Sequence, residues 1–276
     1  MAVTRVAVSP RSRITDGDGG HEAEKRLNRA RGADRLPARR SRRSKLAIVK
    51  LGGSHAASPH LKAWLTAIAS EAGAIVVAPG GGPFADAVRA AQAAMGYDDV
   101  AAHEMALLAM TQFGRALQSL NPALRLSSSL AAIRRTMREG MVPVWSPERM
   151  ARAAGLPQSW DLTSDSLAAW LATALGAGHL VLVKHGRFTA EPVQVSDLVE
   201  RGVVDPFFPC FATGRTFRVS LAGPADSARL SAGLRGGLFP EIVLTDEASK
   251  IACGRPNDQT QNAALGMGAH RLRPFP

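Results

Sequence analysis

The sequence has few of the residues that build covalent frameworks or metal centres. Its 276 residues include only two cysteines, Cys210 and Cys253, too few for a disulfide framework and without metal-ligand spacing. Such sparing use of cysteine is typical of a reducing compartment, so we expect a cytoplasmic protein. The longest uncharged run, 167–183, is interrupted by two glycines and a histidine. A membrane span needs about 20 predominantly apolar residues, so we expect no membrane segment.

Two common nucleotide-binding motifs are also missing. The chain contains neither a Walker P-loop, G-x-x-x-x-G-K-[ST], nor the G-x-G-x-x-G fingerprint of dinucleotide-binding folds. No internal repeat occurs at a fixed period. Any phosphate site in this protein must therefore use a different arrangement of residues.

The positive charge is concentrated at the N-terminus. The formal net charge is +11, and residues 1–44 supply +7 of it with 12 Lys/Arg against 5 Asp/Glu. That segment is rich in Arg, Gly, Ala and Pro and has almost no large apolar residues, so we predict a disordered, arginine-rich arm over 1–44. Charge confined to an arm says little about the globular body, so we expect nucleic acid as a partner only through this arm.

Short β-branched runs alternate with longer alanine-rich stretches from residue 46 onward. The short runs are almost continuously apolar, which is typical of strands covered on both faces. They predict strands at 46–51, 74–79, 142–145, 180–184, 217–221 and 241–245. Apolar residues at three- and four-residue spacing predict helices at 58–73, 84–96, 100–120 and 165–178. The alternation predicts an α/β protein with three layers, α/β/α, and a mainly parallel central sheet. The tail, 246–276, has no sustained period and is expected to be loose.

Two of the predicted strands end in glycine clusters, "VKLGGS" with Gly52 and Gly53, and "PGGG" with Gly80 to Gly82. Glycine lets the backbone approach an anion closely, and helix N-termini favour negative charge. The alternative is a pair of tight turns that need glycine for backbone reasons alone. The residues leave this choice open for the first loop. The triple glycine before Pro83, a residue suited to a first helical turn, favours an anion site.

Lysines end two of the apolar runs. Lys50 ends the first, and Lys184 ends "HLVLVK" shortly before Gly186. A lysine is costly to bury unpaired, so each should reach solvent or an anion. Asp165 lies between them in sequence, in the first turn of a helix that Thr163 or Ser164 could cap. It could complement the helix N-terminus or orient the two lysines.

The order of these motifs over residues 45–245, "VKLGGS", "PGGG", "TSD" before a helix and then a strand ending near "KHG", resembles the amino acid kinase family. The resemblance implies a carbamate kinase-like fold, with an acceptor lobe at 45–160 and a nucleotide lobe at 161–245. It also implies ATP and Mg²⁺ as cofactors, a small phosphorylated molecule as acceptor, and a homo-oligomeric assembly.

The same resemblance implies roles for individual residues. Lys50, Asp165 and Lys184 would be catalytic, while Gly52, Gly53, Ser54, Lys184 and Gly186 would contact the nucleotide. Gly80, Gly81 and Gly82 would hold the anionic group of the acceptor. Arg89 could take the substrate phosphate, or it could equally lie on a solvated helix face or pair with Asp86. Asp86, Asp98 and Glu104 are candidates to meet a substrate amine, although their positions favour ordinary acids on a helix surface. We assign no side chain as a direct metal ligand.

Within the family, "HEMALLAM", "PVWSP", "WDLTSDSLAAWLA" and "GVVDPFFP" are similar to the kinases that act on [5-(aminomethyl)furan-3-yl]methyl phosphate in methanofuran biosynthesis. This implies ATP-dependent transfer of the γ-phosphoryl group to a phosphomonoester. The alternatives are a uridylate kinase or another amino acid kinase, or a non-catalytic relative that binds a nucleotide or oxyanion. Three departures from the family pattern leave the adenine and ribose contacts unassigned. His185 stands where the family commonly has aspartate, Glu191-Pro192 replaces a common Asp-Pro, and 202–245 contains no lysine.

Overall fold

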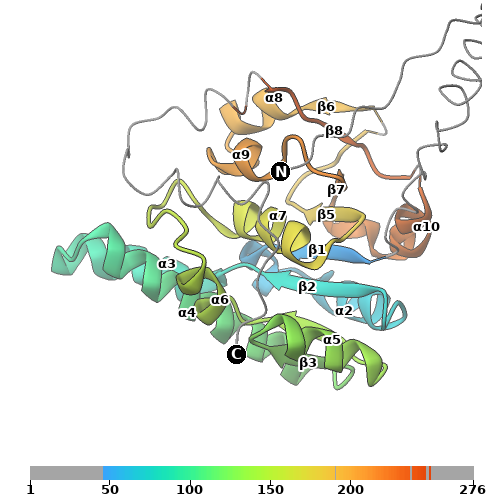
Figure 1. Cartoon of the computed structure of the whole chain (residues 1–276), viewed down its shortest axis with the longest axis horizontal. Helices are drawn as coiled ribbons and strands as arrows, with labels where there is room; N and C mark the ends of the chain where they lie inside the picture. The colour runs from blue at the N-terminus through green and yellow to red at the C-terminus, as the bar shows by residue number, and fades with distance from the viewer. Residues whose placement is uncertain (1–45, 190, 237, 247–248, 250–276) are drawn as a thin grey trace, which may run out of the picture. The chain divides into compact units, whose positions relative to one another are not determined.

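The central element of the fold is a six-stranded sheet in the order β3-β4-β2-β1-β5-β7 (Figure 1). The computed structural model describes residues 46–189, 191–236, 238–246 and 249. The predicted arm, 1–44, and nearly all of the predicted tail lie outside them. Every pairing in this sheet is parallel, which confirms the predicted sheet type. The strands are β1 (Ala47–Leu51), β2 (Ile75–Pro79), β3 (Leu124–Ser127), β4 (Val142–Trp145), β5 (His179–Val183) and β7 (Arg218–Ala222).

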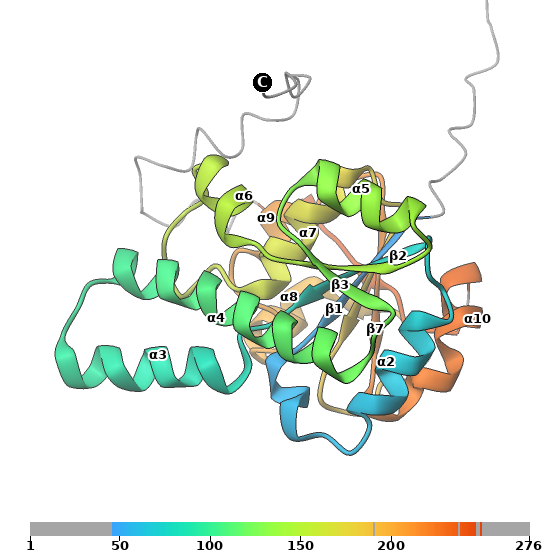
Figure 2. The same ribbon diagram turned by 90° about the horizontal axis from the view of Figure 1, so that it is seen from below.

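Helices cover both faces of this sheet, so the three-layer α/β/α prediction is also confirmed (Figure 2). The longer helices are α2 (Leu61–Ala69), α3 (Gly82–Met95), α4 (Asp99–Leu120), α5 (Leu130–Arg138) and α7 (Ser164–Leu175). The shorter ones are α6 (Glu148–Ala153), α8 (Val195–Glu200), α9 (Phe208–Ala212), α10 (Leu230–Arg235) and the 3₁₀ turns η1 (Gly53–Ala57) and η2 (Pro224–Arg229). Figure 2 shows α3 and α4 running side by side as a hairpin at one side of the sheet.

Alternation along β1 sends successive side chains to opposite faces of the sheet. Val49 belongs to the same buried cluster as Trp64 of α2, and Ile48 belongs to the other cluster, with Leu167 of α7. Lys50 comes two residues after Ile48, so it points toward the α7 face. The strand pattern therefore brings a charged side chain under the beginning of α7.

Some elements differ from the expected ones. The edge strand β3 was not predicted, because it has buried Leu124 followed by exposed Arg125 and so lacks a continuous apolar run. The strand predicted at 241–245 is only β8 (Ile242–Val243), which pairs with β6 (Val193–Gln194) in a separate two-stranded sheet. A five-residue 3₁₀ turn, η1, follows the first glycine loop, and α2 begins only at Leu61.

The sheet is continuous across the predicted boundary between the lobes at residue 160. Strands β1 to β4 belong to the N-terminal part, and β5 and β7 to the C-terminal part. The two groups join where β1 pairs with β5 along all five residues of each strand. Side chains from both parts can therefore meet at the carboxyl ends of these two central strands.

Candidate active site

A cavity opens at the carboxyl ends of β1 and β2, under the N-terminus of α7. Its inner end is lined by Lys50, Asp165 and Lys184, and its outer end by Asp86, Arg89 and Trp160. Gly53, Ser54, Gly81 and Gly82 also line it. Most of the residues predicted to form a site are thus brought together around this first cavity.

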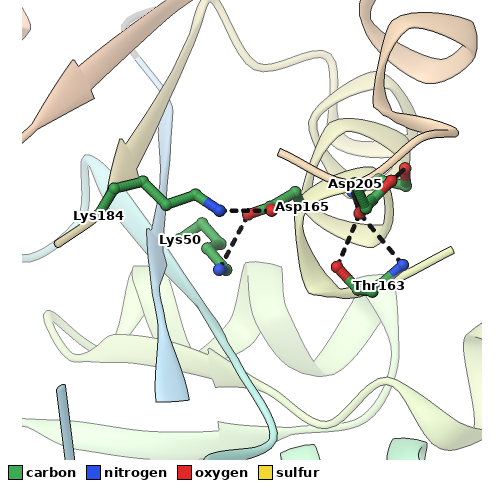
Figure 3. A network of polar contacts seen from close by, with 6 residues as sticks. Lys50, Thr163, Asp165, Lys184 and Asp205 are labelled. Atoms are coloured by element: carbon green, nitrogen blue, oxygen red, sulfur yellow. Dashed lines mark hydrogen bonds and ion pairs between the residues drawn. The ribbon is translucent and has the colours of Figure 1, made fainter. Parts of the chain in front are cut away.

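Asp165 is shared between the two strand-end lysines (Figure 3). Its Oδ1 lies 2.9 Å from the Nζ of Lys50, and its Oδ2 accepts a hydrogen bond of 2.5 Å from the Nζ of Lys184. The Lys50 and Asp165 side chains are only 6% and 5% exposed, and that of Lys184 is 15% exposed. The Asp165 carboxylate therefore faces the lysines and forms a buried charge cluster with them.

The strand register explains why both lysines reach one carboxylate. Lys50 of β1 lies opposite Leu182 of β5 in the parallel pairing. Lys184 comes two residues after Leu182, so its side chain leaves the sheet on the same face as Lys50. Asp165, in the first turn of α7, lies over that face.

Burial and charge act in opposite directions on this cluster. Burial alone would raise the pKa of Asp165, but the ammonium groups of Lys184 and Lys50 lower it to about 2. Burial lowers the pKa of Lys50 below its ordinary value, and the attraction of Asp165 opposes that effect. Asp165 is therefore ionised at neutral pH and supports the charge of Lys50.

Asp205 is a site residue that the sequence analysis did not identify. Its Oδ2 accepts hydrogen bonds from the backbone N–H and the hydroxyl of Thr163, at 3.1 and 2.7 Å, and from the N–H of Ser166 at 3.0 Å. Its Oδ1 accepts a further bond from the Ser166 hydroxyl. Burial, and then the nearby charge of Asp165, raise the pKa of Asp205.

These bonds make Asp205 the cap of α7, in place of a local side chain. Thr163 stands at the N-cap position as expected, but its side chain accepts no capping bond and instead donates to Asp205. The only sequence signal was an aspartate within the otherwise apolar "GVVDPFFP". Because a residue about 40 positions away fills the capping role, Asp165 is left to face the lysines.

The two glycine loops touch each other through their backbones. A Cβ atom on Gly53 would lie 1.9 Å from the backbone nitrogen of Gly82, and one on Gly80 would lie 2.4 Å from the nitrogen of Gly53. Gly82 also has a φ of +59°, which disfavours other residues. The close contact alone thus requires glycine at Gly53 and Gly80, whatever ligand the loops hold. Gly52 comes next to them, where a Cβ would lie 3.5 Å from the Nζ of Lys50.

The outer end of the first cavity contains an arginine stacked on a tryptophan. The guanidinium of Arg89 lies 4.2 Å from the ring centroid of Trp160 and forms an exposed ion pair of 3.3 Å with Asp86. Of the three acids considered for a substrate amine, Asp86 lines the cavity. Asp98 instead caps α4, and Glu104 forms an ion pair with Arg152 at 3.5 Å.

Gly186 borders a second cavity beyond the carboxyl ends of β5 and β7. The other lining residues are His60, Arg187, Phe188 and the segment 223–226. Gly186 therefore does not line the cavity that contains Gly53 and Ser54, although all three were predicted to contact the nucleotide. A molecule bound by all of them would have to span both cavities.

His185, which stands between Lys184 and Gly186, stacks on a buried histidine. Its ring lies parallel to that of His55 in η1, with centroids 4.6 Å apart. His55 is fully buried. Burial, followed by the proximity of His185, lowers the pKa of His55 to about 4. In sequence, His185 therefore lies between a residue that lines the first cavity and one that lines the second.

The acidic side chains near this site are already engaged with other groups of the protein. Within the described residues there is no cluster of three or more His, Cys, Asp or Glu side chains that could hold a metal ion. Both oxygens of Asp165 and both of Asp205 already have partners. Mg²⁺ commonly binds through substrate phosphates and water with few protein ligands.

Among the residues that the structure describes, no helix combines the length and apolar character needed to cross a membrane.

Comparison with solved structures defines the class of fold. A uridylate kinase from Archaeoglobus fulgidus matches 72% of this chain and 100% of its own, with a TM-score of 0.56 and 15% identity. A UMP kinase from Ureaplasma parvum matches 72% of this chain and 99% of its own, with a TM-score of 0.54 and 13% identity. At these identities the likeness shows that the fold is the one found in these kinases.

The chain belongs to the amino acid kinase family, whose model matches residues 45–197. This confirms the resemblance inferred from the motifs. A curated relative, the [5-(aminomethyl)furan-3-yl]methyl phosphate kinase of Methanocaldococcus jannaschii, is 27% identical over 138 residues. The match covers 49% of this chain and 63% of that enzyme.

Proposed function

We propose that this protein is an ATP-dependent kinase that transfers the γ-phosphoryl group to a phosphomonoester, with Lys50, Asp165 and Lys184 as its catalytic residues. The observation that carries the proposal is the pair of lysines held 2.9 and 2.5 Å from one buried carboxylate. Two ammonium groups fixed at the inner end of an open cavity suit phosphate oxygens, because phosphoryl transfer depends mainly on positioning and charge neutralisation.

In the proposed reaction an oxygen of the acceptor's phosphate attacks the γ-phosphorus of ATP. A new P–O bond forms, the bond from the γ-phosphorus to the oxygen it shares with the β-phosphate breaks, and ADP leaves with that electron pair. Lys50 and Lys184 neutralise the negative charge on the transferred group. Asp165 keeps both lysines in place, and the product is a diphosphate. An acceptor that is already a phosphate needs no general base.

The proposed nucleotide position spans the two cavities. Gly52, Gly53, Ser54 and Lys184 would contact the phosphates, and the second cavity at Gly186 would take the rest of ATP. Mg²⁺ would be held by the nucleotide phosphates, where it supplies positive charge to the transferred group. Gly81 and Gly82 would face the acceptor's phosphate, with Gly80 behind them and Asp86 and Arg89 further out.

Our specific proposal for the acceptor is [5-(aminomethyl)furan-3-yl]methyl phosphate, in the biosynthesis of a methanofuran-type one-carbon cofactor. It is supported by the activity after which the 27% identical relative from Methanocaldococcus jannaschii is named. We further propose that the enzyme acts in the cytoplasm as a homo-oligomer. Light scattering on the purified full chain would measure the number of subunits.

The direct test is ADP release by the full chain with Mg-ATP and a panel of acceptors. The panel contains the aminomethylfuran phosphate, UMP, isopentenyl phosphate and amino acids. We expect the furan phosphate to raise ADP release well above the ATP-only rate and to yield a diphosphate by mass spectrometry. A higher rate of ADP release with UMP than with the furan phosphate would make UMP the acceptor and contradict our specific proposal. No stimulation by any member would favour a non-catalytic binding protein.

A further inference from the structure

We propose that Trp160 determines acceptor specificity and selects phosphomonoesters that carry a flat ring over aliphatic ones of similar size. This inference rests on the proposed function, because it concerns the acceptor of that same site. It goes further in naming the residue that recognises the ring of the acceptor.

The first reason is the division of the first cavity into two chemically different ends. Lysine ammonium groups line the inner end, and the indole of Trp160 lines the outer end. The same cavity is also lined by the apolar side chains of Leu107, Met110 and Leu162. An acceptor whose phosphate lies at the lysines can therefore place its other end against apolar side chains and an indole ring.

The second reason is that the indole is held in one orientation by a chain of hydrogen bonds. The Nε1–H of Trp160 donates to the Oε1 of Gln92 at 2.7 Å. The Nε2 of Gln92 donates in turn to Asp99 at 2.9 Å and to the backbone carbonyl of Tyr97 at 3.3 Å. Gln92 thus ties Trp160, from the connection before α7, to the tip of the α3–α4 hairpin.

The third reason is the contact between Trp160 and Arg89. The guanidinium over the ring, 4.2 Å from its centroid, is a contact of a planar cation with a π-system. Half of the Arg89 side chain is exposed, so it can move aside or stay beside an entering ring. Aromatic side chains favour flat partners through offset or edge-to-face packing, which a branched aliphatic chain cannot match.

Trp160 can also be observed directly. Trp64 and Trp145 are fully buried, and Trp170 stacks on Trp145 with centroids 5.9 Å apart. Trp160 is half-buried and is the tryptophan among the residues lining the first cavity. A ring-bearing ligand in that cavity should therefore quench the fluorescence of Trp160 in particular.

The experiment uses the full chain, with benzyl phosphate as the ring-bearing probe and isopentenyl phosphate as the aliphatic one. Trp160→Leu removes the ring, Trp160→Phe keeps a flat ring, and Gln92→Leu removes the hydrogen bond that orients the indole. We measure quenching on titration, and the ratio of kcat/KM for the two probes. Because the ratio compares two substrates on one enzyme sample, partial loss of folded protein cancels.

We expect benzyl phosphate to quench the tryptophan fluorescence of the wild type and not that of Trp160→Phe. We also expect the kcat/KM ratio to favour the ring by about 10-fold in the wild type, to stay near that value in Trp160→Phe, and to approach 1 in Trp160→Leu. The kcat/KM ratio of Gln92→Leu should lie between those of the wild type and Trp160→Leu. Equal ratios in the wild type and Trp160→Leu, or quenching unchanged in Trp160→Phe, would overturn the inference. Quenching by benzyl phosphate without turnover of any acceptor would leave Trp160 as a residue that contacts a ring-bearing ligand, but it would contradict both the kinase proposal and a role of Trp160 in acceptor specificity.

Discussion

The two cavities at the carboxyl edge of the sheet hold their charged groups in different ways. In the first, Lys50 and Asp165 are buried, Lys184 is 15% exposed, and the two ion pairs of Asp165 measure 2.9 and 2.5 Å. In the second, Arg187 is exposed on the loop after β5, and Asp226 belongs to η2, after β7, and pairs with exposed Arg229. Strand register places the two lysines of the first set and the capped start of α7 places Asp165, whereas the charged groups of the second set lie in connections between strands and helices.

This difference predicts a division of labour. Groups that must meet developing charge at the transition state need fixed positions, and the first cavity supplies them. Groups that only retain a nucleotide can tolerate movement, which suits the second. Substitutions in the first cavity should therefore lower kcat, and those in the second should mainly raise the KM for ATP.

The largest effect should come from Lys50→Ala. Loss of one preorganised positive charge at the transferred phosphoryl group should lower kcat by at least about 100-fold. Steady-state kinetics with the best acceptor of the panel measures it, and Lys62→Ala, an exposed lysine of α2, is the matched control. A kcat equal to that of the wild type would remove Lys50 from the proposed mechanism. It would also contradict the proposal that residues of the first cavity govern kcat.

Asp205→Ala should have the next largest effect, on stability as well as activity. It leaves four hydrogen-bond donors of Thr163 and Ser166 without their acceptor, which should lower the free energy of unfolding by roughly 3 kcal/mol. Freeing the start of α7 should also misplace Asp165 and lower kcat. Urea unfolding and kinetics test both, with exposed Asp161→Ala as the control. Unchanged kcat in stably folded Asp205→Ala would show that the cap does not support catalysis.

The histidine stack between the two cavities should make stability depend on pH. The pKa of His55 falls from 6.5 to about 4 on folding, so between these values the unfolded chain binds more protons than the folded one. Stability should therefore decrease as pH falls from about 6.5 to 4, by up to about 3 kcal/mol from this group. Urea unfolding across that range should give a shallower dependence for His55→Phe. Identical pH dependence in both proteins would contradict the assignment.

The smallest effect should come from the second cavity. Arg187→Ala should raise the KM for ATP by a few-fold, which is about 1 kcal/mol, and leave kcat nearly unchanged. Arg201→Ala, an exposed arginine that follows α8, is the matched control. A loss of kcat comparable to that of Lys50→Ala would mean that the two cavities are not divided as proposed.

Much of the fold could be predicted, because its signals are local. The apolar runs at 46–51 and 74–79 are found as β1 and β2 with boundaries within one residue. The half-exposed edge strand β3 and the two-residue β6 were missed, because neither contains a continuous apolar run. The prediction that Lys50, Asp165 and Lys184 form one site depended on the resemblance to a family as much as on the residues.

The order of residues already contained the alternating elements, the two glycine loops and the lysines that end apolar runs. These follow from local preferences, since the spacing of apolar side chains and the position of glycine act within one element. Four features could not be predicted from the sequence alone. They are the sharing of Asp165 by two lysines, the capping of α7 by Asp205, the contact of the two glycine loops, and the position of Gly186 at a second cavity. Those contacts join distant positions, 39 apart for Asp205 and Ser166, so they exist only once strand register and helix packing bring the side chains together.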